Sequence, residues 1–226
     1  MKSATVALLL VWAGGFDALL LVASWADPVG RAIVLMAIGL LLIWVVLIGG
    51  ITWRYQDTLV RTASRLGLDW RSRFVLLATS LALIEEAIAT LMTNAGPLLG
   101  DSTGQAAITA SSNYLEVVTR HSVVVFIPMF IAWAVLLSWR AFPPFAVMIL
   151  FGITGLFGEM LAFGQHNLVA AGFWVLVYGL MVYLPACTVP TGVAPPARPW
   201  HYPLAVVAPI VFAVPVVWLL LWVWPA

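Results

Sequence analysis

Residues 83–94 read "LIEEAIATLMTN" and place two adjacent glutamates, Glu85 and Glu86, about halfway along the apolar stretch 74–97. A run of about 20 apolar residues is long enough to cross the ~30 Å hydrocarbon core of a bilayer as a helix. A carboxylate at the centre of such a helix costs about 2.5–3.5 kcal/mol on insertion scales. The stretch therefore predicts a transmembrane helix that carries a polar site near its middle.

The whole chain has the composition of an integral membrane protein. Of its 226 residues, 64% are hydrophobic and only 8% are charged, whereas a soluble domain has about 25% charged residues. Windows long enough to span a bilayer cover residues 4–25, 32–53, 74–97, 110–138, 143–164, 167–186 and 203–224. We therefore predict an all-α, polytopic helix bundle with about seven transmembrane helices, forming one membrane domain over residues 1–226.

The distribution of Lys and Arg predicts the orientation, because basic residues are retained on the cytoplasmic side of a membrane. A cytoplasmic N-terminus and an outside C-terminus leave only Arg31 and Arg120 away from the inner face. This predicts a multi-pass protein of the cell membrane. Residues 54–73 have the pattern of an amphipathic segment lying on the inner interface, and residues 187–203 form a proline-rich inner loop.

Several classes of function are excluded by the same residues. The single cysteine, Cys187, rules out an internal disulfide and a cysteine metal cluster. The basic residues lie at one membrane face and form no solvated patch, so no nucleic-acid partner is expected. The sole lysine, Lys2, lies outside the predicted bundle, which excludes a retinal Schiff base.

Polar residues of separate spans fall at similar depths in the predicted topology, from the middle of the membrane to its outer surface. The acidic residues inside the spans are Asp17, Glu85, Glu86, Glu116 and Glu159, and Asn94, Asn113, Arg120, His121 and His166 also lie in the outer half. Buried ionisable side chains usually face a bundle interior. This pattern predicts a polar cavity that opens to the outside.

These residues favour a membrane-embedded hydrolase. Glu85 and Glu86 would activate water, because a carboxylate in an apolar pocket suits a general base. A divalent metal ion is expected at Glu116, His121, Glu159 and His166, and Asp17, Asn94, Asn113 and Arg120 would line the polar cavity. Other roles stay open, since Glu116 and Arg120 have the spacing of a local i, i+4 ion pair and His166 is also typical of an interfacial turn.

The order of a Glu-Glu pair, a histidine about 35 residues later and a further histidine on a later span is similar to intramembrane CAAX-type proteases. That resemblance implies that Glu85 and Glu86 activate water with His121 and His166 as partners. This sequence departs from the family pattern at Thr90, Val117 and Ala170, where the family has Arg, Phe and Asn or Asp.

Two other classes of function fit the same composition. Intramembrane carboxylates at staggered depths are typical of a proton or divalent-cation transporter, and the same cavity would suit a carrier of a lipid, a quinone or another hydrophobic small molecule. Alternatively, the buried charges would pair with a partner helix in a non-catalytic subunit or a homo-oligomer. The expected partners are therefore membrane lipids together with an ion, a hydrophobic molecule or a membrane protein.

Two further patterns predict local structure. Gly152, Gly155 and Gly158 recur on one predicted span and indicate close packing of helices in lipid. Pro128 lies inside the window 110–138 and should loosen the helix one turn earlier, because it removes a backbone donor.

Overall fold

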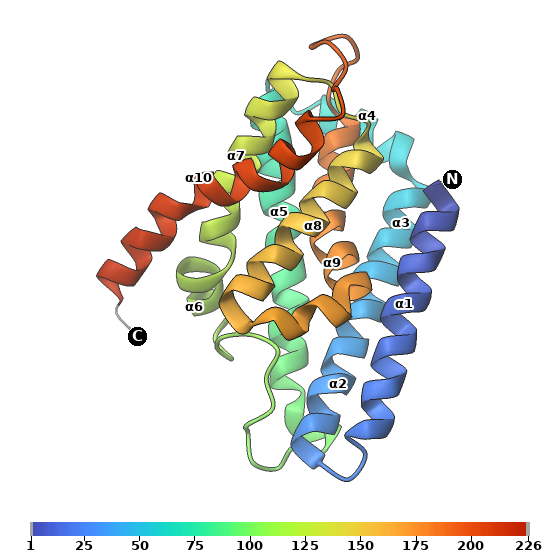
Figure 1. Ribbon diagram of the computed structural model, residues 1–226, viewed down its shortest axis with the longest axis vertical. Coiled ribbons are helices and arrows are strands. Elements are labelled where there is room, and N and C mark those ends of the chain that lie inside the picture. Colours follow the sequence, from blue (N-terminus) through green and yellow to red (C-terminus); the bar gives the residue numbers. More distant parts are fainter. Residues whose placement is uncertain (1, 225–226) are drawn as a thin grey trace.

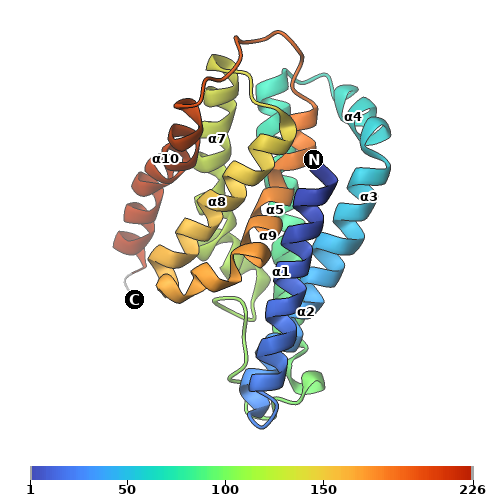
Figure 2. The same cartoon turned by 45° about the vertical axis from the view of Figure 1, so that its right-hand side comes forward.

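The computed structural model describes residues 2–224, except for the side chain of Lys2, and the regular elements of this range are helices (Figures 1 and 2). Six helices are long and apolar enough to cross a membrane, and a bent pair of helices gives a seventh crossing if it is one span. The predicted all-α, polytopic architecture is confirmed.

The elements follow one another up and down the bundle. They are α1 (Lys2–Ala23), α2 (Pro28–Leu40), η1 (Leu41–Ile48), α3 (Gly49–Arg54), α4 (Gln56–Ser64), α5 (Trp70–Asn94), η2 (Gly96–Leu99), α6 (Tyr114–Glu116), η3 (Val117–His121), α7 (Val123–Trp139), α8 (Pro144–Phe163), η4 (Gln165–Ala170), α9 (Ala171–Cys187) and α10 (His201–Val223). α2, η1 and α3 continue each other as one span, Pro28–Arg54. The N-terminus of α5, α4 and the loop before α10 lie at the same end of the molecule (Figure 1), so the arginines of these segments gather there.

Helix α9 is the most buried of the spans and packs against α1, α5 and α8. Its apolar side chains, among them Leu176, Val177 and Met181, belong to the main core. The indole of Trp44 on η1 donates a 2.9 Å hydrogen bond to the backbone oxygen of Val177. Polar groups on α9 are therefore placed inside the bundle by the packing of their neighbours.

Two glycines allow α8 to approach α9 closely. A Cβ atom at Gly152 would lie 2.3 Å from the backbone oxygen of Val175, and one at Gly155 would lie 2.2 Å from the ring of Tyr178. Both distances are far inside van der Waals contact, so the predicted role in helix packing holds for these two positions. A Cβ at Gly158 would meet nothing within 4 Å.

We expect Gly152→Ala to destabilise the protein, because the added methyl group meets backbone that cannot rotate away. Overpacking of this kind costs about 1–3 kcal/mol. Gly158→Ala is the matched control on the same helix and should stabilise the fold by about 0.5–1 kcal/mol, because alanine loses less conformational entropy in a helix. Thermal unfolding in detergent micelles measures both, and equal transition temperatures for the two variants would contradict the close contact.

The bent pair, Tyr114–His121 and Val123–Trp139, lies where the sequence predicts the fourth crossing, and we refer to it by that name. η3 has a π-helical turn, and the axes of the helices on either side of Ser122 are bent by 47°. The amide of Ser122 bonds the oxygen of Val117 at 3.0 Å, one residue further back than in an α-helix. The bend therefore lies earlier than Pro128 predicted, and residues 110–113 of the predicted window precede the helix. The wide turn at Ser122, rather than the proline, marks the break.

The loop that connects α5 to α6 is ordered by Asp101, which is buried. Its carboxylate accepts hydrogen bonds from the hydroxyl and amide of Thr103 and from the amide of Ala106. These bonds, the one from the Thr103 hydroxyl first, lower the pKa of Asp101 to about 2. Because the folded state has the lower pKa, this contribution to stability is present above the ordinary carboxyl range and is lost as the pH falls through about 2.

The proline-rich segment 187–203 is tied to the end of α7. The amide of Ala141 donates a 2.9 Å hydrogen bond to the backbone oxygen of Pro195, and the amide of Ala197 donates a 3.0 Å hydrogen bond to the backbone oxygen of Ala141. His201 is buried, and its Nε2 accepts a 2.9 Å hydrogen bond from Nε of Arg140. His201 therefore has a structural role at this end of the bundle.

Candidate functional site

Three glutamates on two helices form the candidate site. Glu85 and Glu86 on α5 are only 5% and 8% exposed, and Glu159 on α8 is half-buried. Glu85 interacts electrostatically with both Glu86 and Glu159, and Glu86 also interacts with Glu159. We call Glu85, Glu86 and Glu159 the carboxyl cluster.

The burial of both α5 glutamates follows from the packing of this helix. Adjacent residues of an α-helix point about 100° apart, so a helix covered on one side only would expose one of them. α5 contacts α7 and α9, and these neighbours cover both directions. The adjacent pair Glu85 and Glu86 is therefore enclosed within the bundle.

Tyr178 on α9 joins the cluster. Its hydroxyl donates a hydrogen bond to Oε1 of Glu159 and it also interacts electrostatically with Glu85 and Glu86. The tyrosine ring is held by the close approach at Gly155 and by stacking on Trp174, with ring centroids 5.7 Å apart. The same glycine that allows α8 to pack on α9 therefore also places the hydroxyl beside Glu159.

The break in the fourth crossing also reaches the cluster. The side chain of Ser122 interacts with the carboxyl group of Glu86, and the hydroxyl of Tyr114 donates a 3.0 Å hydrogen bond to the backbone oxygen of Leu83 on α5. A π-helical turn often occurs at a functional site. Four structural segments thus meet here: α5, α8, α9 and the bend at Ser122.

The cluster contains acids and hydroxyl groups without a neutralising cation. Over residues 2–224 one side-chain ion pair is present, between Glu116 and Arg120, and it lies elsewhere. Three ionised carboxylates would repel one another strongly in a medium of low dielectric constant. We therefore expect the cluster to hold at least one proton when it is buried in a membrane.

A polar stripe leads from the cluster along α5. Glu86, Thr90 and Asn94 follow each other at intervals of four residues, and such residues share one face of a helix. Among the described residues, the buried hydroxyl of Thr90 has no hydrogen-bond partner. Asn94 is exposed and its amide donates 3.0 Å hydrogen bonds to the backbone oxygens of Thr90 and Ser112. The stripe therefore runs from the buried cluster to the exposed end of α5.

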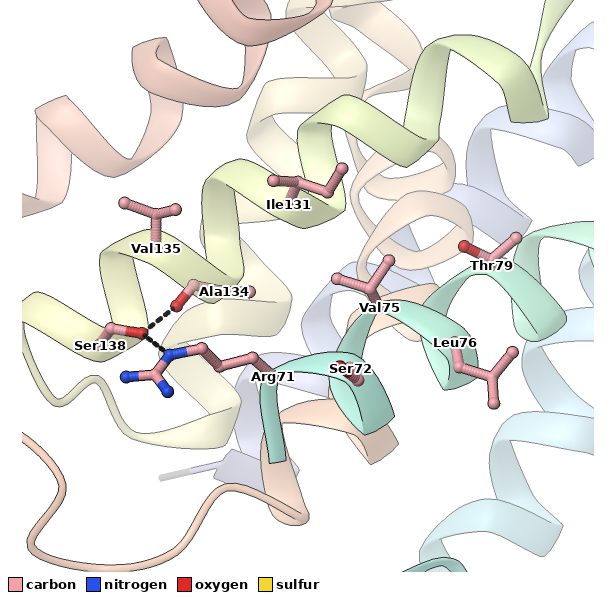
Figure 3. Close-up of a pocket in the computed structure, with 9 residues that line it drawn as sticks. All are labelled: Arg71, Ser72, Val75, Leu76, Thr79, Ile131, Ala134, Val135 and Ser138. Atoms are coloured by element: carbon pink, nitrogen blue, oxygen red, sulfur yellow. Dashed lines mark hydrogen bonds between the residues drawn. The ribbon is translucent and has the colours of Figure 1, made fainter. Parts of the chain in front are cut away.

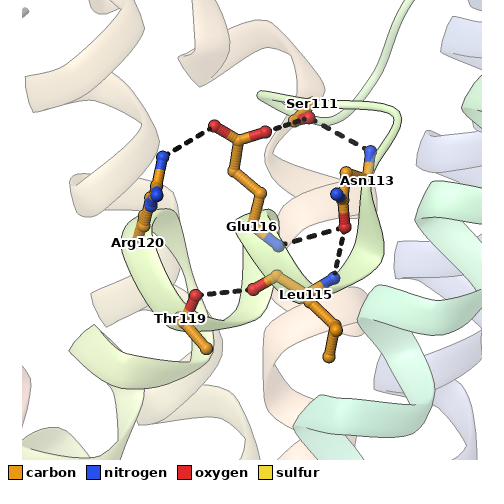
Figure 4. A network of polar contacts seen from close by, with 6 residues as sticks. All are labelled: Ser111, Asn113, Leu115, Glu116, Thr119 and Arg120. Carbon is orange, nitrogen blue, oxygen red and sulfur yellow. Dashed lines mark hydrogen bonds and ion pairs between the residues drawn. The ribbon is translucent and has the colours of Figure 1, made fainter.

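Glu116, Arg120 and Asn113 form a separate network at the start of the fourth crossing (Figure 4). Glu116 bonds Arg120 at 3.2 Å and the hydroxyl of Ser111 at 2.8 Å. Asn113 caps α6 by accepting a hydrogen bond from the amide of Leu115. The side chains of Glu116 and Arg120 are 38% and 44% exposed. The predicted i, i+4 ion pair is confirmed, so the charges of Glu116 and Arg120 neutralise each other within one turn of helix.

The predicted metal site finds no support. Over the described residues, no group of three or more His, Cys, Asp or Glu side chains is placed to hold a metal ion. Of the four expected ligands, Glu116 pairs with Arg120 and Glu159 accepts from Tyr178. His121 and His166 are both exposed. The four side chains therefore do not come together as one set of metal ligands among the described residues.

Asp17 is buried on α1, at 4% exposure, and within the described part of the chain its Oδ2 has no hydrogen-bond partner. Over residues 2–224, Arg120 forms no ion pair with it. Of the residues that the sequence predicted for one polar site, the structure brings Glu85, Glu86 and Glu159 together, whereas Glu116 and Arg120 pair separately. The prediction from the sequence missed Tyr178 and Ser122, although Tyr178 is the one hydroxyl-bearing residue in the apolar run 171–182.

The fold and this cluster define a polytopic helical membrane protein with buried carboxyl groups shared between helices. Comparisons of the chain with protein-family models, with curated proteins and with solved structures give no match.

Proposed function

We propose that this protein transports protons across the cell membrane, with the carboxyl cluster as its proton-binding site. The observation that carries the proposal is that Glu85, Glu86 and Glu159 lie within the range of electrostatic interaction and form no ion pair over residues 2–224. Such a group lowers its free energy by binding protons. Proton relays in membrane proteins are built from intramembrane carboxyl groups of this kind.

The contacts of Tyr178 and Ser122 support the proposal. Both bring a hydroxyl group to a cluster glutamate, and a hydroxyl both donates and accepts hydrogen bonds. It can therefore pass a proton on without carrying a charge. The stripe from Glu86 through Thr90 to Asn94 would give an access route at the end of α5 that the distribution of arginines predicts to face outside.

The bend at Ser122 supports a transport cycle. Transporters commonly bind ions beside discontinuous helices, because a break allows one segment to move relative to the next. Here the break lies against Glu86, so movement of η3 relative to α7 would change the surroundings of the cluster. We propose that this movement transfers the proton between the outer and the inner side.

The experiment is a proton-flux assay with the full chain reconstituted in lipid vesicles. A potassium diffusion potential drives the flux, and a pH-sensitive dye inside the vesicles measures it. The wild-type protein should acidify the interior faster than protein-free vesicles do. Equal rates with and without protein would overturn the proposal.

A glutamate-activated hydrolase is the second candidate. The observation that favours it is the contact of Tyr178 with Glu159 beside the adjacent pair Glu85 and Glu86, because a base and a proton donor within one pocket suit general acid and base catalysis. Cleavage of a hydrophobic peptide or lipid ester by wild-type protein in the same vesicles, lost in Glu85→Gln, would favour this reaction over transport.

A further inference from the structure

A groove between α5 and α7 is lined by residues that are not part of the carboxyl cluster, and Arg71 near the start of α5 lies at one end of it (Figure 3). It has a volume of about 750 Å³, which is within the range of small-molecule sites, about 300–1,000 Å³. Its apolar walls include Val75 and Leu76 from α5 and Ile131 and Val135 from α7, and Arg71 and Ser138 lie at its polar end. The groove is therefore apolar along its length and cationic at one end.

Arg71 is held in place by α7. Its Nε donates a 2.7 Å hydrogen bond to Oγ of Ser138, and the Ser138 hydroxyl donates its own hydrogen to the backbone oxygen of Ala134 at 2.7 Å. The guanidinium group also lies over the ring of Trp70, 4.9 Å from its centroid. These contacts fix the side chain across the end of the groove.

The two terminal amino groups of Arg71 remain available. Among the described residues they make no hydrogen bond, and Figure 3 shows them pointing away from Ser138. Asp69 is the nearby acid, but its carboxylate accepts from the Ser72 hydroxyl and from the amides of Arg71 and Ser72. The bond from the Ser72 hydroxyl is the largest cause of the lowered pKa of Asp69. The oxygens of Asp69 are thus engaged in capping α5.

We propose that this groove binds an anionic phospholipid, with one acyl chain along Val75 and Ile131 and the phosphate on the terminal amino groups of Arg71. Charge complementarity identifies the occupant, because a guanidinium group binds phosphate with two parallel hydrogen bonds. The position of the groove also fits this occupant. The groove lies near the predicted inner face, and anionic lipid headgroups of the inner leaflet attract basic residues. This proposal is independent of proton transport.

Native mass spectrometry of the full chain in detergent tests the site with two probes of identical acyl chains, phosphatidylglycerol and phosphatidylcholine. The wild-type protein should bind phosphatidylglycerol about fivefold more tightly, as expected for one arginine at a membrane surface. Arg71→Gln should remove that preference. Arg65→Gln is the control, because Arg65 is exposed at the same end but does not line the groove.

Two further variants separate the headgroup from the acyl chain. Ser138→Ala releases Nε of Arg71 and should weaken the preference without removing the charge. Ile131→Trp adds bulk to the groove wall and should weaken both lipids equally. Equal binding of the two lipids by wild-type protein, or the same loss of preference in Arg65→Gln as in Arg71→Gln, would overturn the proposal. If Arg71→Gln does not fold, the Ser138→Ala result decides.

Discussion

Vesicles that contain a variant with glutamine at all three cluster positions, Glu85→Gln, Glu86→Gln and Glu159→Gln, are expected to lose proton flux by roughly 100-fold or more. Glutamine has nearly the same shape as glutamate, but it cannot exchange a proton in the same way. The fold should be retained, because replacing buried charges with neutral groups of similar volume is often neutral or stabilising. Flux in potential-driven vesicles and thermal unfolding of the same preparation measure the two effects.

The matched control for this variant is Glu116→Gln. Glu116 is also a glutamate of the predicted outer half, but it is partly exposed and paired with Arg120. An exposed ion pair of this kind contributes about 0–1 kcal/mol, so Glu116→Gln should leave both flux and stability nearly unchanged. A folded triple variant with wild-type flux would refute the role of the cluster, and so would an equal loss of flux in Glu116→Gln.

Tyr178→Phe is expected to reduce proton flux by roughly 10- to 100-fold. The substitution removes the hydroxyl that donates to Glu159 but keeps the ring that packs against Gly155 and Trp174. Loss of one positioned proton donor in a buried site has effects of about this size. The same vesicle assay, with the protein amount normalised, measures the rate.

Tyr183→Phe controls for the loss of a tyrosine hydroxyl from the same helix. Its hydroxyl donates a 2.7 Å hydrogen bond to Gln56 near the other end of α9, away from the cluster. This variant should keep wild-type flux. If Tyr183→Phe slowed the flux as much as Tyr178→Phe, the effect would belong to α9 packing and the proton-transfer role of Tyr178 would be rejected.

The fold was largely predictable because apolar length sets the number of membrane crossings. The windows 4–25, 74–97 and 143–164 correspond to α1, α5 and α8. The fourth window was the exception. Composition shows Pro128 but does not show that the amide of Ser122 bonds Val117 in a π-helical turn, since the apolar residues on either side suit a straight helix equally well.

Residues of the candidate site were predictable only from the free-energy cost of a charge in hydrocarbon or from their spacing along a helix. Glu85, Glu86 and Glu159 stood out because each is expensive in hydrocarbon, and the pair of Glu116 with Arg120 followed from their i, i+4 spacing. Tyr178 was missed because its contact with Glu159 depends on the register of α8 against α9. That register is set by the close approach of α8 to α9 at Gly152 and Gly155. Composition alone does not show which residue of α9 lies opposite these glycines.

The metal prediction shows the limit of inferring a site from depth along a helix. His121, His166 and Glu159 share a predicted level in the membrane, but a level leaves the direction of each side chain undetermined. In the structure the two histidines are exposed while Glu159 contacts Tyr178 on α9. Residues at the same depth therefore come into contact only when their helices also pack with those side chains facing each other.

Infrared spectroscopy of the protein in membranes at neutral pH tests the central claim most directly, because a protonated carboxylic acid has its own carbonyl-stretching band. The shared cluster predicts such a band in the wild-type protein, its shift on exchange into heavy water, and its loss or alteration in each of Glu85→Gln, Glu86→Gln and Glu159→Gln. Absence of the band in wild-type protein, or a band that none of the three substitutions changes, would contradict the account.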